Sequence, residues 1–583
     1  MIKCISVSLI LLVLLATTAL SAERVRIVVD GLEGRPLENV RAALRLPEGM
    51  VKPDGEIDKG MLDQFRKGIP DQVQEALQPY GFFNSRTEVF VQTSTEGTVL
   101  RVVVEPGTPV TISSVKVTIE GPGTYETQLQ ELVRSFPLKK GDVLLSDVYE
   151  KAKADLQSRA RNSGYLDADF PVHKIDVYRT KGIAEIELSL RTGNRYYFGD
   201  VTFLGAPKYP DSFLRRYLSF KKGDAFSYLN LNKTRLNLYN SDRFREVFFQ
   251  TDKKTAKNQD IPVVINLTPS PEKRIKTGVG YGTDTGARFL VRYQDVNIID
   301  RGHEFRSELN VSERLYGLAG AYIVPSGKDF RSFTALRLSF LRETPVTYES
   351  NSVSLELNRE RGFGENSQGG MFIRLLDERF TIGGETTSSF LVLPGVRLYG
   401  QRVDNLIRPQ KGYRYAIELR GTDTFLGSTV GLFQVVSVGD LLFSLPGRLT
   451  LLLRSQTGFT FQRQAFDEVP VTLRFFAGGD RSVRGYSYQS LGPRDANGDV
   501  IGGKHLLFGS VELERAIGND WGIAAFYDAG NAFDAFTNIT FAQSAGLGIH
   551  YYSKVGPFRL DIARQVNTPS PATRIHFIVG IFI

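Results

Sequence analysis

Apolar and polar residues alternate along the sequence from about Arg274 to the final residue, and this alternation strongly restricts the possible fold. In residues 304–311, 413–420 and 558–562, the large apolar side chains fall on one face of an extended chain and the charged ones fall on the other. No helical periodicity interrupts this stretch. Since one face suits lipid and the other suits water, the pattern predicts a transmembrane β-barrel.

A soluble β-sandwich alternates in the same way, and length helps to separate the two folds. Sandwich domains rarely need about 310 continuous residues of strand without a second, helical layer. Clusters of turn-forming residues divide the stretch into about 16 strands, and an even number places both ends of the barrel on the periplasmic side. We therefore expect a membrane barrel over residues 271–583.

The N-terminus has the pattern of a cleavable secretory signal. Lys3 precedes an apolar core at residues 9–16, and small residues follow up to Ala22. This apolar core is shorter than the about 20 residues that a transmembrane helix needs. Residues 1–22 are therefore predicted to be a signal peptide, which would take with it Cys4, the single cysteine of the chain. The mature protein would then lack disulfides, a thiol nucleophile and cysteine-based metal sites.

Charge and motifs argue against several classes of function. The 72 basic and 64 acidic residues give a formal net charge of +8, which fits an anionic partner or, more simply, solvated faces and a wet lumen. Nucleic acid is not expected to bind an exported chain. His303-Glu304 lacks the second histidine of a zinc-protease helix, and no G-x-S-x-G elbow, P-loop or dinucleotide motif is present. We expect no enzyme activity, cofactor or metal.

The N-terminal half contains a repeated pattern. Three short β-rich runs that end in glycine begin at Ile27, Val117 and Val201, which are 90 and then 84 residues apart. The second and third copies also share a Lys-Lys-Gly-Asp turn, at 139–142 and 221–224, ahead of a stretch with helical periodicity. Each copy predicts the order strand, helix, helix, strand, strand, which is a compact α+β module with exposed sheet edges.

The order of elements and the positions of the glycines resemble POTRA domains, the periplasmic modules of outer-membrane protein assembly factors. The predicted modules comprise residues 23–110, 111–195 and 196–270. In POTRA domains a sheet edge can accept an extended client strand, and unpaired edge N–H and C=O groups are the physical basis of that role. Tandem α+β modules would equally serve as spacers.

The longest break in the alternation runs from about Arg463 to Gly502. Long loops are usually functional or disordered, and residues 474–486 are rich in aromatic residues and glycine, which argues against disorder. We expect a folded element tucked into the barrel lumen. Within it, Val483-Arg484-Gly485-Tyr486 looks like the signature of the BamA/TamA-type superfamily of assembly barrels and secretion pores.

This resemblance covers essentially the full mature chain and is especially close to TamA-type barrels at residues 473–486. It implies that the loop arginine, Arg484, pairs with the strand aspartate, Asp528. A guanidinium in a partly desolvated lumen needs a carboxylate in fork geometry, although both residues would also fit as unrelated lumen charges. The residues implicated are Asp480, Arg481, Val483, Arg484, Gly485 and Tyr486 of the loop and Phe526, Asp528 and Gly530 of the strand.

The first and last predicted barrel strands, around residues 276–281 and 574–583, meet at a seam. If few hydrogen bonds join them, the seam can open and offer a template edge to a client strand, whose unpaired backbone groups would each cost several kcal/mol in lipid. Glycines there weaken side-chain packing or, equally, permit curvature and close backbone approach. The candidate seam residues are Gly278, Gly280, Tyr281, Gly282 and Gly580.

Together these features predict an outer-membrane factor that helps to insert or export β-barrel and autotransporter-type clients. The resemblance implies a TamB-type partner anchored in the inner membrane, besides unfolded client proteins and outer-membrane lipid. A general BamA-type insertase and a two-partner secretion pore are the alternatives. A diffusion porin has no reason to carry three modules, a secretion pore would be expected to have two modules and a helix in its lumen, and a five-module BamA would be longer.

Overall fold

The computed structural model describes residues 25–51, 57–94, 97–327, 329–462, 466–537, 539–554 and 556–582. The predicted signal peptide, residues 1–22, lies outside these ranges, as does Ile583. The chain divides into two compact units. One comprises Met1–Val201, Phe220–Leu231 and Thr251–Val263, and the other comprises Thr202–Ser219, Asn232–Gln250 and Val264–Ile583.

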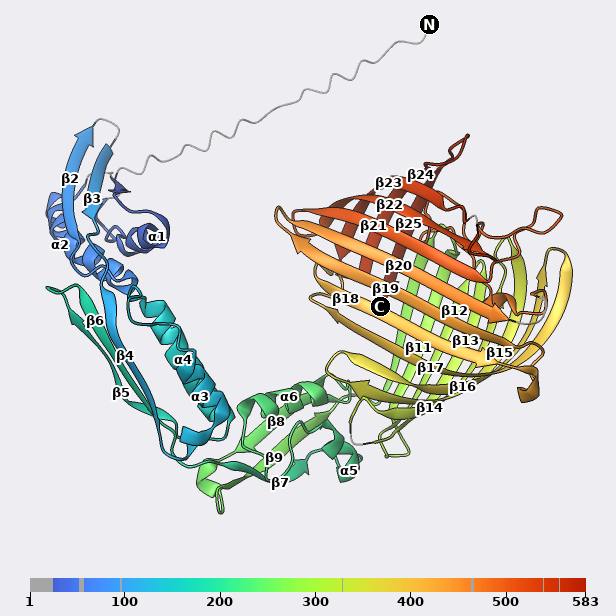
Figure 1. Ribbon diagram of the computed structural model, residues 1–583, viewed down its shortest axis with the longest axis horizontal. Coiled ribbons are helices and arrows are strands. Elements are labelled where there is room, and N and C mark those ends of the chain that lie inside the picture. The colour runs from blue at the N-terminus through green and yellow to red at the C-terminus, as the bar shows by residue number, and fades with distance from the viewer. Residues whose placement is uncertain are drawn as a thin grey trace, which may run out of the picture. The chain divides into compact units, whose positions relative to one another are not determined.

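Three modules precede the barrel, and each has the predicted order of strand, helix, helix, strand, strand (Figure 1). The first contains β1 (Val25–Asp30), α1 (Gly34–Ala43), α2 (Lys59–Leu77), β2 (Arg86–Ser94) and β3 (Gly97–Glu105). The second contains β4 (Thr111–Glu120), α3 (Thr127–Arg134), α4 (Ser146–Asn162), β5 (Asp169–Tyr178) and β6 (Ile183–Arg191). The third contains β7 (Tyr197–Leu204), α5 (Asp211–Leu214), α6 (Tyr228–Tyr239), β8 (Phe244–Thr251) and β9 (Asp260–Pro269).

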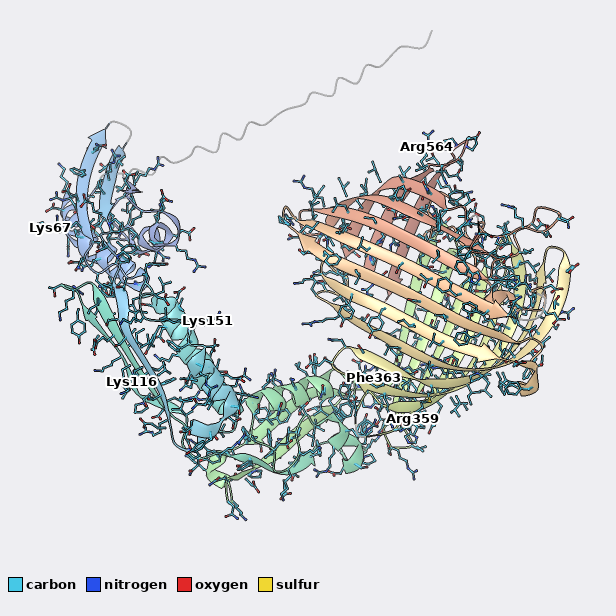
Figure 2. The ribbon with its side chains drawn as sticks, in the orientation of Figure 1. Lys67, Lys116, Lys151, Arg359, Phe363 and Arg564 are labelled. Carbon is cyan, nitrogen blue, oxygen red and sulfur yellow. The ribbon has the colours of Figure 1, made fainter. Side chains whose placement is uncertain are left out.

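In every module the last strand lies at the centre of a three-stranded sheet. The central strand is parallel to the first strand and antiparallel to the other in the first two modules. In β3, Leu100 and Val102 alternate with more exposed residues and pack against Val73 and Leu77 of α2. The other face of the sheet is more exposed, and charged side chains such as Lys67 project from the modules (Figure 2).

The glycines that mark the repeat are required by close backbone contacts. Gly31 ends β1 with a φ of +89°, and a Cβ there would lie 2.1 Å from the carbonyl oxygen of Val104. Gly205 ends β7 with a φ of +84°, and its Cβ would lie 2.3 Å from the carbonyl oxygen of Leu267. Only glycine tolerates both the left-handed backbone and this approach, which explains why the pattern recurs.

The second half of the chain forms a closed antiparallel barrel of sixteen strands, as predicted (Figure 1). The strands are β10 (Lys273–Gly282), β11 (Gly286–Ile298), β12 (His303–Ser312), β13 (Leu315–Pro325), β14 (Phe333–Glu343), β15 (Tyr348–Phe363), β16 (Ser367–Ile382), β17 (Glu385–Val403), β18 (Gly412–Thr422), β19 (Leu432–Leu445), β20 (Leu449–Gln462), β21 (His505–Ile517), β22 (Trp521–Phe533), β23 (Ala542–Ser553), β24 (Gly556–Gln565) and β25 (Thr573–Phe582).

The two faces of the barrel wall differ as the alternation predicts. On β14, Leu336, Leu338 and Phe340 are exposed on the outside. On the neighbouring β15, Glu356 and Glu360 point inward and are buried. An apolar exterior around a polar interior is the arrangement of an outer-membrane barrel. Among the helices of the described ranges, none has the length and apolar character needed to cross a membrane.

Candidate functional site: the lumen loop and the seam

The long segment between β20 and β21 folds back on itself inside the barrel. Phe475 and Gly503 exchange two backbone hydrogen bonds, of 2.9 and 2.8 Å, and Ala477 and Leu491 exchange two more of 3.0 Å. A short 3-10 helix at Val471–Leu473 precedes this ladder. These internal bonds satisfy the backbone of the loop, so it can enter the lumen as a folded element.

The arginine of the motif, Arg484, is held by a carboxylate fork on β22. Its Nε and Nη2 atoms donate to the two carboxylate oxygens of Asp528, each at 2.8 Å. The backbone N–H of Arg484 donates to the same carboxylate at 3.2 Å. The two side chains are only 1% and 0% exposed. Because a bidentate pair fixes orientation as well as position, this contact sets where the loop lies on the barrel wall.

Two further carboxylates approach the same guanidinium. Nη1 of Arg484 donates to Glu512 on β21 at 2.7 Å and to Asp561 on β24 at 3.2 Å. The face of Phe526 also lies against it, with the guanidinium carbon 3.3 Å from the ring centroid. Sequence reasoning named Phe526 and Asp528 but missed Glu512 and Asp561. Inward-facing charges occur on most strands, and only the three-dimensional register selects those that meet Arg484.

Neighbouring basic side chains contact these acidic groups. Arg454 lies 3.3 Å from Glu512, and Nε2 of His550 lies 3.1 Å from Asp561. Glu512, Glu514 and His550 bring one ligand-type atom each within 4.8 Å of one another. The Nδ1 atom of His550, however, already contacts Glu514 at 2.8 Å. These three side chains therefore belong, with Arg484 and Arg454, to one cluster of polar contacts that we call the ion-pair network.

The other buried residues of the motif fit closely against the wall. Val483 is fully buried and packs on Phe508 of β21. Gly485 has no room for a side chain, because a Cβ there would lie 2.7 Å from the Cβ of Ser544 on β23. Its carbonyl accepts a hydrogen bond from Nε2 of Gln565 at 3.0 Å. Close approach is thus the physical reason for glycine at this position.

Three predicted residues have less direct roles. Arg481 is exposed, and its carbonyl accepts a hydrogen bond of 3.0 Å from Nε2 of Gln456, a residue of the wall. Tyr486 is half-buried, and its backbone N–H donates to the carbonyl of Val483 at 3.1 Å. Gly530 lies within the wall, where a Cβ would come 2.8 Å from a carbonyl oxygen of β21. Gly530 therefore serves strand packing.

A second wall of the barrel holds the first part of the loop, and sequence reasoning missed this contact. We call Val469, Val471, Thr472 and Leu473 the wall anchor. Val469 and Leu473 are buried in an apolar cluster whose other members are Leu376, Leu391, Leu393, Val430 and Leu432. All of these lie on or next to β16, β17 and β19, whereas the carboxylates that bind Arg484 lie on β21, β22 and β24. The loop is therefore fixed on two separate walls.

Polar contacts reinforce the wall anchor. Glu378 of β16 is 0% exposed, and one of its oxygens accepts the backbone N–H of Thr472 at 3.3 Å and the hydroxyl of Ser350 at 2.9 Å. Its other oxygen accepts the hydroxyl of Thr472. Nε2 of Gln434 donates to the carbonyl of Leu473 at 2.8 Å. A buried carboxylate and a buried amide that both find partners on the loop make the position of the wall anchor specific.

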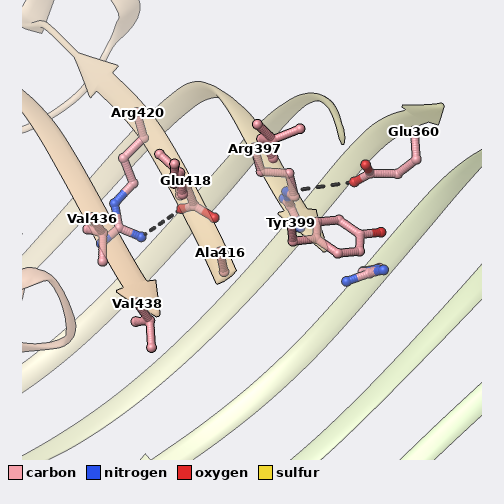
Figure 3. Close-up of a pocket in the computed structure, with 11 residues that line it drawn as sticks. Glu360, Arg397, Tyr399, Ala416, Glu418, Arg420, Val436 and Val438 are labelled. Atoms are coloured by element: carbon pink, nitrogen blue, oxygen red, sulfur yellow. Dashed lines mark hydrogen bonds and ion pairs between the residues drawn. The ribbon is translucent and has the colours of Figure 1, made fainter. Parts of the chain in front are cut away.

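Beyond the wall anchor, toward the end of the barrel where β10 begins, the lumen wall becomes polar. A pocket of about 360 Å³ lies there, and charged side chains of β15, β17 and β18 line it (Figure 3). Arg397 lies 3.7 Å from Glu360, and Arg420 lies 3.1 Å from Glu418. The change from an apolar to a charged wall marks how far the loop reaches into the lumen.

The tip of the loop contacts the turn that follows β10. The backbone N–H of Asp480 donates to Oδ2 of Asp284 at 2.6 Å. Gly479 permits this approach, since a Cβ there would lie 2.4 Å from the same oxygen. Burial and the neighbouring carboxylate of Asp480 raise the pKa of Asp284 from its usual value near 3.8 to about 7. The contact therefore depends on a group that titrates near neutral pH.

We expect the contact between tip and turn to weaken as the pH rises. The pKa of Asp284 is raised in the folded state, because a charge there would be desolvated and would lie beside the carboxylate of Asp480. Protonated Asp284 therefore stabilises the folded tip, fully so below the pKa of Asp284 in the unfolded chain. This stabilisation is lost as the pH rises through about 7. A spin label attached to an Arg481→Cys variant should become more mobile between about pH 6 and about pH 8. Asp284→Asn should abolish the change. Equal mobility across this range in the labelled Arg481→Cys protein would contradict the assignment.

The barrel closes between β10 and β25 along a short ladder. It runs from Gly278 opposite Phe582 to Gly282 opposite Ile578, which is five residue pairs. By contrast, β10 pairs with β11 along its full length. Within the ranges that the structure describes, β25 pairs with none of residues 273–276. An unpaired strand edge carries free backbone N–H and C=O groups.

The predicted seam residues lie on both sides of this ladder. Gly278, Gly280 and Gly282 share the lumen face of β10 and alternate with exposed residues such as Tyr281. Gly580 is directly opposite Gly280. Past the ladder, Thr283 and Phe577 form further hydrogen bonds of 2.8, 3.2 and 3.3 Å. Among the described residues, the pairing between β10 and β25 thus lies at the end of the seam nearest the loop tip.

Known protein families match the whole described architecture. Residues 273–583 match a model described as the Omp85 superfamily domain. Residues 26–106 match a model described as POTRA domain, TamA domain 1. Residues 111–191 and 196–270 match the POTRA model described as surface antigen variable number repeat.

Curated relatives and solved structures agree with these matches. Two proteins named outer membrane protein assembly factor BamA are similar to the chain. The one from Nitratidesulfovibrio vulgaris is 24% identical over 453 residues, or 72% of this chain and 54% of the relative. The one from Neisseria meningitidis serogroup B is 22% identical over 514 residues, or 80% of this chain and 63% of the relative. The chain therefore spans less than two thirds of either relative.

The fold is also similar to the crystal structure of BamA from Haemophilus ducreyi lacking POTRA domains 1–3. The TM-score is 0.63 at 16% identity, and the match covers 81% of this chain and 100% of that one. The resemblance to the BamA/TamA-type superfamily that the sequence predicts is confirmed by the family matches. The chain belongs to the Omp85 superfamily, as an outer-membrane β-barrel whose three POTRA modules lie in the periplasm.

Proposed function

We propose that the protein inserts or exports outer-membrane client proteins by lending the edge of β10 to their strands, without catalytic chemistry. The observation that carries this proposal is the short seam, which leaves residues 273–276 of β10 without a partner on β25 among the described residues. These residues lie at the periplasmic end of the barrel, where a client strand would arrive. Pairing with β10 would satisfy backbone groups that otherwise each cost several kcal/mol in lipid.

The space beside this edge suits an incoming strand. A cavity of about 820 Å³ lies in the lumen, and its lining includes Arg274 and Lys276 of β10 together with Leu473 of the loop. Its polar walls would keep an unfolded segment hydrated until it pairs. The modules add further edges, and β2 is one of them, with Phe90 49% exposed. A client would thus meet unpaired strand edges first in the periplasm and then at the seam.

A TamA-type role is the more specific form of this proposal. The support is the match of the first module to the TamA-type POTRA model, together with an arm of three modules. We infer a TamB-type partner, anchored in the inner membrane, that meets the first module. If a long β-rich protein with an inner-membrane anchor is encoded next to this one, the inference gains support. A large secreted adhesin there would favour a secretion pore, and neither neighbour would favour a BamA-type insertase.

Locking the seam should stop client insertion. Tyr281 and Val579 are directly opposite each other, so the double variant Tyr281→Cys/Val579→Cys can form a disulfide across the ladder. We expect the oxidised barrel, reconstituted in vesicles, to insert an unfolded barrel client at least about tenfold more slowly than the reduced barrel. The two single-cysteine variants are matched controls. Equal insertion rates in the oxidised and reduced states would refute opening of the seam.

A further inference from the structure

An arginine on β11 reaches across the seam strand. Arg288 is directly opposite Gly280 of β10, on the lumen face. Its guanidinium passes beneath β10, and Nη2 donates to the carbonyl oxygen of Val579 on β25 at 3.1 Å. Among the described residues, no carboxylate forms an ion pair with Arg288. The side chain therefore links β11 to β25, two strands that are not neighbours in the ladder.

The glycine at position 280 makes this reach possible. A Cβ there would lie 2.6 Å from Nε of Arg288 and 2.6 Å from the carbonyl oxygen of Val579. Both distances are too short for any side chain, so a residue other than glycine would block the path of the guanidinium. Glycine at position 280 is therefore explained by this close approach.

We propose that Arg288 is a positioning residue that holds the seam closed and, once β25 moves away, presents a hydrogen-bond donor to the backbone of an incoming client strand. Five residue pairs of the described ladder and the contact between Thr283 and Phe577 join β25 to this side of the barrel, so a hydrogen bond from a charged donor adds substantially to them. The donor recognises a carbonyl oxygen, which every strand carries, so it would serve clients of any sequence. The second part of the proposal rests on the proposed function.

Hydrogen exchange at the seam tests the first part. In lipid nanodiscs, Arg288→Met should speed amide exchange of β25 at residues 578–582 by about tenfold, because the lost bond is worth about 1.5 kcal/mol or more. Exchange in β15 and β16 should not change. Arg288→Lys, which restores one charged donor, should recover part of the protection. Arg292→Met is the matched control, since Arg292 lies on the same strand and face and contacts Glu308 at 2.6 Å.

The outcomes separate this proposal from the proposed function. If Arg288→Met leaves exchange in β25 unchanged, or speeds exchange in all strands equally, Arg288 does not hold the seam. If exchange at β25 rises and the disulfide lock still leaves client insertion unaffected, the seam contact stands and the proposed function fails. If the lock stops insertion, Arg288→Met should also change the insertion rate in the reduced, unlocked barrel. An unchanged rate there would overturn the role toward clients.

Discussion

Arg484→Ala should detach the lumen loop from its wall and destabilise the barrel by about 3–5 kcal/mol. The substitution removes the bidentate partner of Asp528 and leaves Glu512 and Asp561 buried with one cation fewer. Removing one member of a buried ion pair costs more than the pair contributes, because the remaining charge stays desolvated. Urea unfolding of the barrel, followed by the gel shift between folded and unfolded forms, measures the change.

The control for this substitution lies three residues away. Arg481 belongs to the same loop and has the same charge, but its side chain is exposed, so Arg481→Ala should change stability by less than about 0.5 kcal/mol. Asp528→Asn should reproduce most of the effect of Arg484→Ala. If Arg484→Ala proved as mild as Arg481→Ala, the loop would not depend on the carboxylate fork.

Leu473→Asp should release the other end of the loop and open the lumen to ions. The new carboxylate would enter the apolar cluster formed with Leu391 and Leu393, next to the buried Glu378. An unpaired charge in such a site costs several kcal/mol, which the loop avoids by leaving the wall. Conductance of single barrels in planar bilayers should then rise at least about threefold.

A matched substitution separates the charge from the loss of shape. Leu473→Met keeps the volume and apolar character, so it should cost less than about 1.5 kcal/mol and leave conductance near that of the unmodified protein. Glu378→Ala should weaken the wall anchor from its polar side and raise conductance to a smaller extent. If Leu473→Asp conducts no more than Leu473→Met, the wall anchor does not hold the loop across the lumen.

The sequence predicts the barrel well because each strand must meet lipid on one face and water on the other. That local demand appears in every strand and needs no knowledge of its neighbours. The part of β17 that contacts the wall anchor departs from this rule, since Leu391 and Leu393 point inward although Phe390 and Val396 of the same strand face outward. The uninterrupted apolar run at residues 390–394 is the signal that both faces are covered. What covers the inner face lies about 80 residues away in sequence, so the run alone does not identify it.

The contacts of Arg484 follow from the sequence only in part. Arg484 and Asp528 were paired through a family resemblance, whereas Glu512 and Asp561 look like any other inward-facing charge. A glycine in a strand can weaken side-chain packing, permit curvature or allow another group to approach the backbone closely. At Gly280 the reason is close approach, because Nε of Arg288 and the carbonyl oxygen of Val579 would each lie 2.6 Å from a Cβ there. Register between distant strands decides all of these contacts, and register is not local.

Photocrosslinking from the edge of β10 during insertion of a client is the most direct test of the template role of this strand. Ile275 lies on the lipid-facing side of this edge, is 69% exposed and has no described partner on β25. Leu355 is lipid-facing on the distant β15 and serves as the control position. With a photocrosslinking residue at either position and a client stalled during insertion, we predict capture of the client by position 275 and not by position 355. Equal capture at both positions, or capture at 355 alone, would contradict a template role for β10.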